Sequence, residues 1–350
     1  MALAPLFATA CHSGGVRPRS AELFALDART GRQQWRVRLD NLDVTPPIAG
    51  GDAVYVGGSS GTAAYEGATG HLRWHSGYVS QSSPLGANVV GSSLVTSDGH
   101  SIVAVDKTGD ELWRNQDADY GCPVTADVTG AYARASDGEV HALALGNGHQ
   151  RWTVAAEPGF CAPVLPAGGA VYVGDTDGTI RALDAGSGEQ RWSVVTEVKM
   201  PVPQGMSNGS LFVKPLGANP VNGGTVLGLD VRDGHELFRV GPLHGVPPFD
   251  LAVGRAIYGY QGTFGSPDLA AFDARSGTLR WHESVPLGRL ATGEGLVVSA
   301  GPDITAVADV DGAHRWTAPL DYSDARVVHA AIGGGRVYVV VGTGSRPNED

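Results

Sequence analysis

Aromatic residues recur at a nearly constant interval along most of this chain. All seven tryptophans share one local context, and the gaps between successive ones are 39, 39, 39, 40, 89 and 35 residues. The gap of 89 residues divides into 46 and 43 if Phe238 takes the same place in its own segment. The aromatic series is then Trp35, Trp74, Trp113, Trp152, Trp192, Phe238, Trp281 and Trp316. Eight units of about 40 residues indicate a solenoid or a propeller rather than two ordinary domains.

A glycine lies four residues before the aromatic residue in every unit. Thr, Ser, Asn or Asp precedes this glycine each time, as in Thr30-Gly31 and Asp233-Gly234. The short polar side chain can bond to the nearby backbone and the glycine can adopt a positive φ, so the pair is typical of a tight turn between two strands. The eight glycines are Gly31, Gly70, Gly109, Gly148, Gly188, Gly234, Gly277 and Gly312.

Short strands are expected before each of these corners. Runs such as Val171-Tyr172-Val173 precede Asp-Gly turns, and prolines such as Pro163 stand where the first strand of a unit would begin. Each unit therefore predicts four short antiparallel strands, with no helix of about ten residues. One such sheet buries too little on its own, whereas its radial repetition produces a β-propeller.

The two ends of the chain complete one unit. The first unit begins near Glu22 with only its last two strands, and the chain ends with two strands, at 327–332 and 336–341, that have no continuation. We therefore predict an all-β fold, an eight-bladed β-propeller of four-stranded antiparallel blades closed by pairing of the N- and C-terminal strands. The expected division is a leader and tether at 1–20, a single propeller domain at 21–341 and a tail at 342–350.

The repeat also resembles a known family. The segment Ala25–Trp35 carries the pattern Ala-x-Asp-x-x-Thr/Ser-Gly-x-x-x-Trp, which returns nearly intact at Ala182–Trp192 and Ala271–Trp281. It is similar to the tryptophan-docking repeat of the pyrroloquinoline-quinone-type (PQQ-type) β-propeller superfamily. That superfamily includes quinoprotein dehydrogenases, which carry an adjacent-cysteine disulfide and a Glu/Asn/Asp set for calcium, and also cofactor-free lipoproteins that act as assembly scaffolds at bacterial envelopes. Because this sequence has no Cys-Cys pair, the resemblance implies the non-enzymatic members without a cofactor, and PQQ with calcium is the alternative.

Composition narrows the range of partners. Acidic residues outnumber basic ones, 36 against 25, and the net charge of −11 disfavours nucleic acid or an anionic membrane surface as the main partner. No window approaches about 18 consecutive apolar residues, so no bilayer-spanning helix is predicted. The three cysteines form no CxxC spacing and no HExxH segment occurs, so no metal site is expected.

The first ten residues form a short apolar run with small residues just before Cys11. This run resembles the end of a bacterial lipoprotein signal, with lipidation at Cys11 and the following residues as a tether. We therefore expect a protein of the cell envelope or the extracellular space that contacts a membrane only through a lipid anchor. No Lys or Arg precedes the run, and a cytoplasmic location is the alternative.

The order of the strands predicts which face of the ring carries function. If the strands of each blade run outwards from the axis, the connections between blades share one face with the loops between second and third strands, where sequence can vary on a rigid scaffold. The longest such loops are Pro215–Asn222 and Gln261–Pro267. Cationic side chains at the mouth of an acidic protein would suit an anionic or aromatic ligand, and an ordinary rim of polar residues is the alternative. The residues expected to bind a ligand or partner are Tyr78, Tyr120, Lys199, Met200, His244, Phe249, Tyr260, Phe264, Arg289 and Arg326.

Cys122 and Cys161 are 39 residues apart and therefore occupy equivalent places in adjacent blades. We expect buried free thiols, because neighbouring blades need not bring the two Cα atoms within the ~7 Å that a disulfide requires. A disulfide and a functional thiol are the alternatives. His244 and His329 are candidates for a general base, but neither has an identified nucleophile or metal partner, so no catalytic residue is assigned.

These features together favour a non-enzymatic binding or scaffold propeller, expected to be monomeric, that engages a protein or peptide through its loop face. One alternative is a quinoprotein-like oxidoreductase, or another enzyme that uses the central funnel. The other alternative is a sensor of a small molecule.

Overall fold

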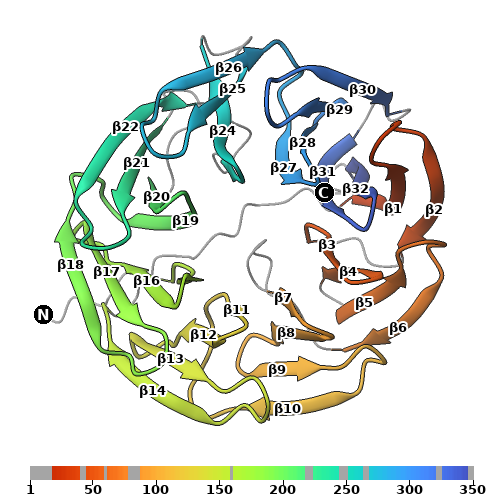
Figure 1. Cartoon of the computed structure of the whole chain (residues 1–350). Helices are drawn as coiled ribbons and strands as arrows, with labels where there is room; N and C mark the ends of the chain where they lie inside the picture. Colours follow the sequence, from red (N-terminus) through yellow and green to blue (C-terminus); the bar gives the residue numbers. More distant parts are fainter. Residues whose placement is uncertain are drawn as a thin grey trace, which may run out of the picture.

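The computed structural model is a ring of eight four-stranded antiparallel sheets around a central axis (Figure 1). It describes residues 18–39, 45–58, 61–77, 87–157, 161–216, 224–243, 251–262, 268–320 and 325–345. These residues form 32 strands and no helix, so none of them forms a helix that could cross a membrane. The chain is therefore an all-β, eight-bladed β-propeller, as its repeat predicts.

We number the blades along the chain, and the strands of each blade follow one another from the axis to the rim (Figure 1). Blade 1 contains β31 (Ala325–Gly333), β32 (Arg336–Ser345), β1 (Pro18–Asp27) and β2 (Gln33–Leu39). Blades 2 and 3 contain β3 (Ile48–Gly50), β4 (Ala53–Gly58), β5 (Gly61–Glu66), β6 (Leu72–Ser76), β7 (Ala87–Val90), β8 (Ser93–Ser97), β9 (Ile102–Val105) and β10 (Glu111–Asn115). Blades 4 and 5 contain β11 (Thr125–Asp127), β12 (Gly130–Arg134), β13 (Glu139–Leu143), β14 (Gln150–Ala155), β15 (Leu165–Ala167), β16 (Ala170–Gly174), β17 (Thr179–Asp184) and β18 (Gln190–Val195). Blades 6 to 8 contain β19 (Pro201–Ser207), β20 (Ser210–Pro215), β21 (Gly224–Asp230), β22 (Glu236–Leu243), β23 (Ala252–Val253), β24 (Ala256–Gln261), β25 (Asp268–Asp273), β26 (Leu279–Glu283), β27 (Arg289–Gly293), β28 (Leu296–Ala300), β29 (Asp303–Ala308) and β30 (His314–Pro319).

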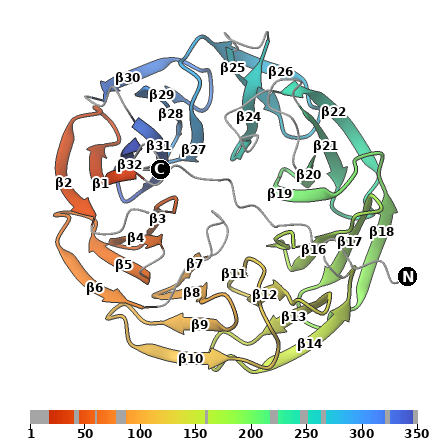
Figure 2. The same ribbon diagram turned by 180° about the vertical axis from the view of Figure 1, so that it is seen from behind.

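Strands β1 and β32 close the ring. They pair antiparallel from Pro18 opposite Ser345 to Asp27 opposite Arg336, and β1 lies between β32 and β2 in both views (Figures 1 and 2). Each end of the chain thus supplies two strands of blade 1, as predicted. The pairing continues a few residues beyond the expected boundaries of 21 and 341, because the two terminal strands extend together.

The core lies between adjacent blades. One buried cluster joins Tyr132 and Trp152 of blade 4 to Val171 and Leu183 of blade 5. Neighbouring blades cover both faces of each sheet in this way. The middle strands are therefore mostly buried, and every residue of β12 is buried. The apolar surface that a single blade leaves exposed is thereby removed from water by its two neighbours.

Each tryptophan docks on the corner of the following blade. The indole Nε1 of Trp152 donates a hydrogen bond to the backbone oxygen of Ala185 over 3.1 Å, and that of Trp316 donates to Ala28 over 2.8 Å. All seven tryptophans make the equivalent bond. The bond from Trp316 joins blade 8 to blade 1 and so contributes to closure.

The corner glycines meet two requirements at once. All eight have positive φ angles, between 67° and 88°, as predicted for the turn. Each also lies against the aromatic ring of the preceding blade, and a Cβ on Gly188 would be 2.8 Å from Cδ2 of Trp152. Gly277 lies in the same way against Phe238, which therefore takes the tryptophan's place, as predicted.

Candidate binding face

The antiparallel order of the strands divides the loops between two faces of the ring. The blade-to-blade connections and the loops between second and third strands lie on one face, which we call the connection face. The turns between first and second strands and the docking corners lie on the other, which we call the turn face. The described segments of the connection face include 98–101, 116–124, 135–138, 175–178, 196–200 and 284–288.

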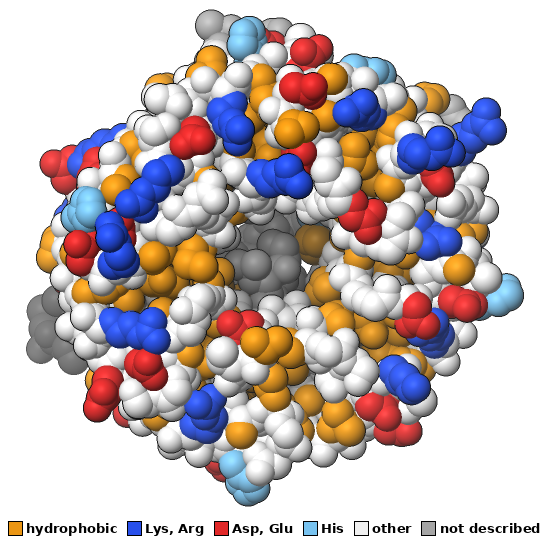
Figure 3. Space-filling model, in the orientation of Figure 1, with side chains coloured by type: hydrophobic (Ala, Val, Ile, Leu, Met, Phe, Trp, Pro, Cys, Tyr) orange, Lys and Arg blue, Asp and Glu red, His pale blue; other side chains and the backbone are white. Residues whose placement is uncertain are grey.

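The innermost strands of the blades surround the axis of the ring (Figure 1). Figure 3 shows one face hollowed at the centre, with the charged side chains mainly nearer the outer rim. Arg289 on β27 and His329 on β31 lie on neighbouring innermost strands, and Arg289 is half-buried. Burial, assisted by the positive charge of Arg289, lowers the pKa of His329 to about 3. The imidazole of His329 is therefore neutral at physiological pH and does not add a cation to the axis.

Two tyrosines expected at the funnel lie in the core. Tyr120 and Tyr260 are both fully buried. The hydroxyl of Tyr120 donates to Oδ1 of Asn115 over 2.9 Å, and burial raises the pKa of Tyr120 to about 12. The hydroxyl of Tyr260 lies 2.5 Å from Oγ of Ser299 and accepts a hydrogen bond from the backbone N–H of Gly288. These rings fix the connections to the blades from inside, so they cannot offer their side chains to a partner.

Lys199 and Met200 lie on the connection face between blades 5 and 6 and are exposed. Met200 is 38% exposed and has a positive φ of 47°, and its backbone oxygen accepts a hydrogen bond from the N–H of Leu216 over 2.8 Å. Leu216 follows β20 and is 36% exposed, and Val195, the last residue of β18, is 77% exposed. We call Val195, Met200 and Leu216 the apolar group: Met200 and Leu216 are joined by this backbone hydrogen bond, and Val195 ends the outermost strand from which the connection starts.

The other predicted binding residues fall where the structure gives no description. Tyr78, His244, Phe249 and Phe264 lie outside the described residues, as does Cys11. Arg326 belongs to β31, but its side chain is not among those described. Of the ten predicted residues, the structure thus places Lys199 and Met200 together on the connection face and Arg289 apart from them, in blade 8.

The expectation of free thiols at Cys122 and Cys161 is wrong. The two residues form a disulfide, with their Cα atoms 5.2 Å apart. Each lies in a blade-to-blade connection just before an innermost strand, and neighbouring connections converge there closely enough to satisfy the geometry of the bond. The disulfide therefore fastens the two connections that flank blade 4.

A buried ion-pair network adjoins this disulfide-linked sector. The guanidinium of Arg134, only 1% exposed, donates to Oδ1 of Asp175 over 3.2 Å and to the backbone oxygen of Gly174 over 2.7 Å. Arg181 contacts the other oxygen of Asp175 at 3.0 Å. Burial lowers the pKa of Arg134, and the charge of Asp175 opposes that change. The network joins blade 4 to blade 5 and holds the connection face rigid between them.

Sequence reasoning did not single out this network. The one feature of the sequence that could have indicated it is Arg134 at the end of the second strand of blade 4. The second strands of the preceding and following blades end at Ser97 and Gly174. An arginine that is only 1% exposed needs a buried partner, which Asp175 supplies.

A second carboxylate is held by hydrogen bonds in the connection face of blade 3. Asp98 accepts hydrogen bonds from the backbone N–H and the hydroxyl of Ser101, at 2.7 and 2.5 Å, and pairs with Arg114. Burial alone would raise the pKa of Asp98, but the hydrogen bonds from Ser101 and His100, with that from Arg114, lower it to about 2.

The closed ring and its tryptophan-docking corners define the class of protein. A closed ring of eight blades, in which an indole of each blade but one docks on a glycine corner of the next, is a PQQ-type β-propeller. Within it, the chain belongs to the family described as outer membrane protein assembly factor BamB, whose profile matches residues 15–100, 98–240 and 265–346.

Solved structures share the fold. BamB from Moraxella catarrhalis is 18% identical with a TM-score of 0.58, and the match covers 87% of this chain and 98% of that one. The computationally designed protein Ika8 is 14% identical with a TM-score of 0.61, and the match covers 86% and 96%. Sqt1 of Saccharomyces cerevisiae is 12% identical with a TM-score of 0.55, and the match covers 87% and 95%. No curated protein matches the sequence at a significant level.

Proposed function

We propose that this chain is a non-enzymatic binding propeller of the bacterial cell envelope, which engages a protein or peptide through its connection face. The observation that carries the proposal is the apolar group. Three of the eight large hydrophobic residues that are exposed in the described part of the chain fall within 22 residues at the junction of blades 5 and 6. Exposed apolar side chains on a rigid scaffold suit recognition of another protein.

The family supports this proposal. Its description names an assembly factor, a role that is carried out by binding other proteins. The rigid setting of the face supports it as well, because the Cys122–Cys161 disulfide and the Arg134–Asp175 pair limit rearrangement of blades 4 and 5 on binding.

The proposal requires no cofactor. In the quinoprotein members that the sequence resembles, the quinone site includes a disulfide between adjacent cysteines. Here the disulfide joins residues 39 positions apart and links two connections, and this difference supports a propeller that works without the quinone. Attachment to the envelope by a lipid on Cys11 belongs to the proposal, and release from the membrane fraction in Cys11→Ser would support it.

Affinity purification from the source cells tests the binding face. The double variant Met200→Glu/Leu216→Glu places two charges in the apolar group, and Val128→Glu is its control, since Val128 is 85% exposed in a turn of the turn face. We expect a protein partner that is retained by the wild type and by Val128→Glu and is lost from the double variant. Equal retention by all three proteins, or co-purification of a small molecule alone, would contradict the proposal.

A further inference from the structure

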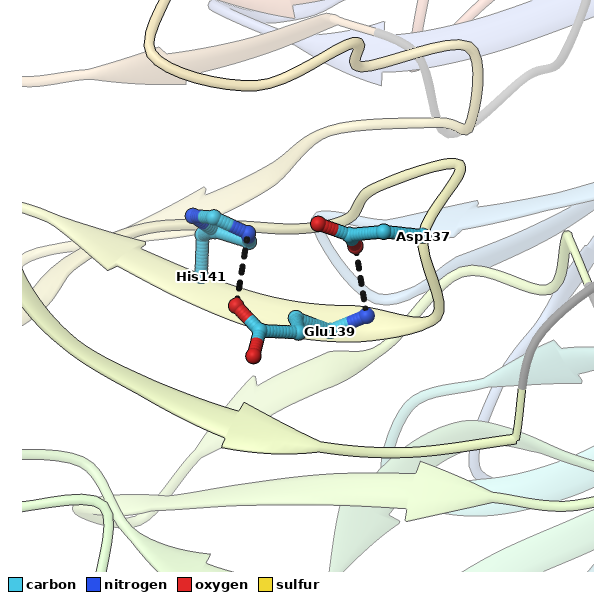
Figure 4. Close-up of side chains that lie close together, drawn as sticks. All are labelled: Asp137, Glu139 and His141. Carbon is cyan, nitrogen blue, oxygen red and sulfur yellow. Dashed lines mark hydrogen bonds and ion pairs between the residues drawn. The ribbon is translucent and has the colours of Figure 1, made fainter.

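Three side chains with metal-binding atoms meet at the start of β13. Asp137 lies in the loop before the strand, Glu139 is the first residue of the strand, and His141 follows two positions later on the same side. One ligand atom of each residue lies within 4.8 Å of the others. Figure 4 shows the carboxylate of Glu139 directed toward the imidazole of His141, with Asp137 at the adjoining turn.

The imidazole of His141 provides an independent observation that points to a ligand. Its side chain is only 5% exposed, and Nε2 has no hydrogen-bond partner among the described residues. The same nitrogen faces Oε2 of Glu139 at 3.7 Å. Buried polar atoms in folded proteins are nearly always bonded, so this nitrogen requires an explanation.

The surroundings of the ring fix which nitrogen is available. Nδ1 of His141 lies 3.1 Å from Oε1 of Gln150 and 3.4 Å from the hydroxyl of Tyr120. An amide oxygen can only accept, so Nδ1 carries a hydrogen and a metal ion would bind through Nε2. Metal-binding histidines are commonly oriented by a carbonyl or carboxylate behind the ring in this way. The Tyr120 ring, packed edge-on at 5.3 Å, holds the imidazole in place.

The two carboxylates supply the other ligand atoms of the cluster. Glu139 is 44% exposed and free to adjust its rotamer. One oxygen of Asp137 accepts a hydrogen bond from the backbone N–H of Glu139 over 2.9 Å, and its second oxygen is available to an ion. Two ligands of a tetrahedral zinc ion, each about 2.1 Å from the metal, lie about 3.4 Å apart. The observed 3.7 Å between Nε2 of His141 and Oε2 of Glu139 is close to this separation.

We propose that Asp137, Glu139 and His141 bind one divalent transition-metal ion, with zinc as the ion that this donor set favours. A nitrogen with two carboxylates suits zinc, whereas calcium and magnesium prefer oxygen ligands throughout. The ion removes the repulsion between the lone pair of Nε2 and the carboxylate of Glu139. Three protein ligands would leave the fourth position of a tetrahedral ion to water or another ligand. This inference departs from the expectation that the chain has no metal site, and it does not depend on the proposed function.

Blade 5 offers a matched control. Asp177 forms the same turn as Asp137, with Oδ1 accepting a hydrogen bond from the N–H of Thr179 over 2.8 Å. Thr179 and Arg181 stand there in the places of Glu139 and His141. Asp177→Asn therefore removes an equivalent turn carboxylate without touching the proposed ligands.

Isothermal titration calorimetry on tag-free, metal-stripped full-length protein tests the site with zinc chloride. We expect the wild type and Asp177→Asn to bind one zinc ion with equal affinity, and Glu139→Gln and Asp137→Asn to bind it at least tenfold more weakly. Both substitutions are at exposed or half-exposed positions, and circular dichroism will verify that the variants are folded. Cobalt(II) should give visible absorption bands in the wild type that Glu139→Gln loses.

Three results would overturn the proposal. The first is the absence of stoichiometric zinc binding, and the second is zinc binding that Glu139→Gln leaves unchanged. The third comes from ¹⁵N NMR of the imidazoles. A signal for His141 as an imidazolium, unmoved by zinc, would show that the ring instead forms an ion pair with Glu139. Movement of the Nε2 signal on addition of zinc, retained in Asp177→Asn, would support the site.

Discussion

Replacement of Gly188 by alanine tests whether the corner glycines hold the blades together. Gly188 has a φ of +77°, and the added Cβ would lie 2.8 Å from Cδ2 and 3.0 Å from Cε3 of Trp152. A side chain in the left-handed region costs about 1–2 kcal/mol. Crowding of a packed indole costs about a further 1–3 kcal/mol. We therefore expect the free energy of unfolding to fall by about 2–5 kcal/mol.

Gly295 provides the control for the backbone cost. Its φ of +79° matches that of Gly188, but nothing lies within 4 Å of the Cβ that alanine would add. Gly295→Ala should therefore lose only about 1–2 kcal/mol. The difference between the two variants isolates the contact between the glycine and the indole of Trp152, about 1–3 kcal/mol.

Equilibrium unfolding in guanidinium chloride, followed by circular dichroism, measures both variants. In a Trp152→Ala background the indole is absent, so Gly188→Ala should cost no more than Gly295→Ala does in the wild type. Equal losses for Gly188→Ala and Gly295→Ala in the otherwise unchanged chain would refute the docking argument.

Three further predictions concern closure, the disulfide and acid stability. Trp316→Phe keeps an aromatic side chain but leaves the backbone oxygen of Ala28 without its hydrogen-bond donor. The free energy of unfolding, measured with denaturant, should therefore fall by about 1–3 kcal/mol. An unchanged unfolding midpoint would argue against a contribution from this bond. Replacement of Cys122 and Cys161 by alanine opens a loop of 39 residues and should lower the free energy of unfolding by up to about 4 kcal/mol. Chemical reduction of the wild type should cause the same loss. An unchanged free energy of unfolding in both experiments would show that the bond does not stabilise the fold. Because folding lowers the pKa of Asp98 from 3.8 to about 2, the unfolded chain takes up the proton first. The resulting stabilisation of about 2 kcal/mol is present above pH 4 and lost between about pH 4 and 2. Over this range the free energy of unfolding of Asp98→Asn, measured with denaturant, should fall less steeply than that of the wild type. An identical fall in the two proteins would contradict the assignment.

The ring could be predicted because its signals are local and repeated. The interval between aromatic residues and the polar–glycine pair before each of them lie within one unit, and eight repetitions fix the number of blades. The incomplete units at the two ends predict closure for the same reason. The contact of Gly188 with Trp152 joins two blades, so the spacing along the chain does not reveal it.

The candidate binding face was predictable only in part. Strand order assigns Lys199 and Met200 to the connection face, where the structure places them exposed. The same reasoning assigns Tyr120 and Tyr260 to the funnel, but both rings turn into the core, because a bulky apolar ring with one satisfied hydroxyl is more stable there. A position in a connection does not specify the direction of its side chain.

The two cysteines and the cluster of Asp137, Glu139 and His141 also show that position in the sequence does not give side-chain contacts. The separation of Cys122 and Cys161 places them in adjacent blades, but only the converging connections show that they meet. The sequence shows that Glu139 and His141 lie on one side of a strand, whereas the burial of the unbonded nitrogen of His141 is evident only from the folded chain.

Photo-crosslinking in living cells tests most directly whether the connection face is where this propeller binds. A photoreactive amino acid replaces Met200 on the connection face in one strain and Val128 on the turn face in another, and both positions are exposed. The proposed function predicts a discrete protein adduct from position 200 and none from position 128. An adduct from position 128 alone, or the same adducts from both positions, would contradict it.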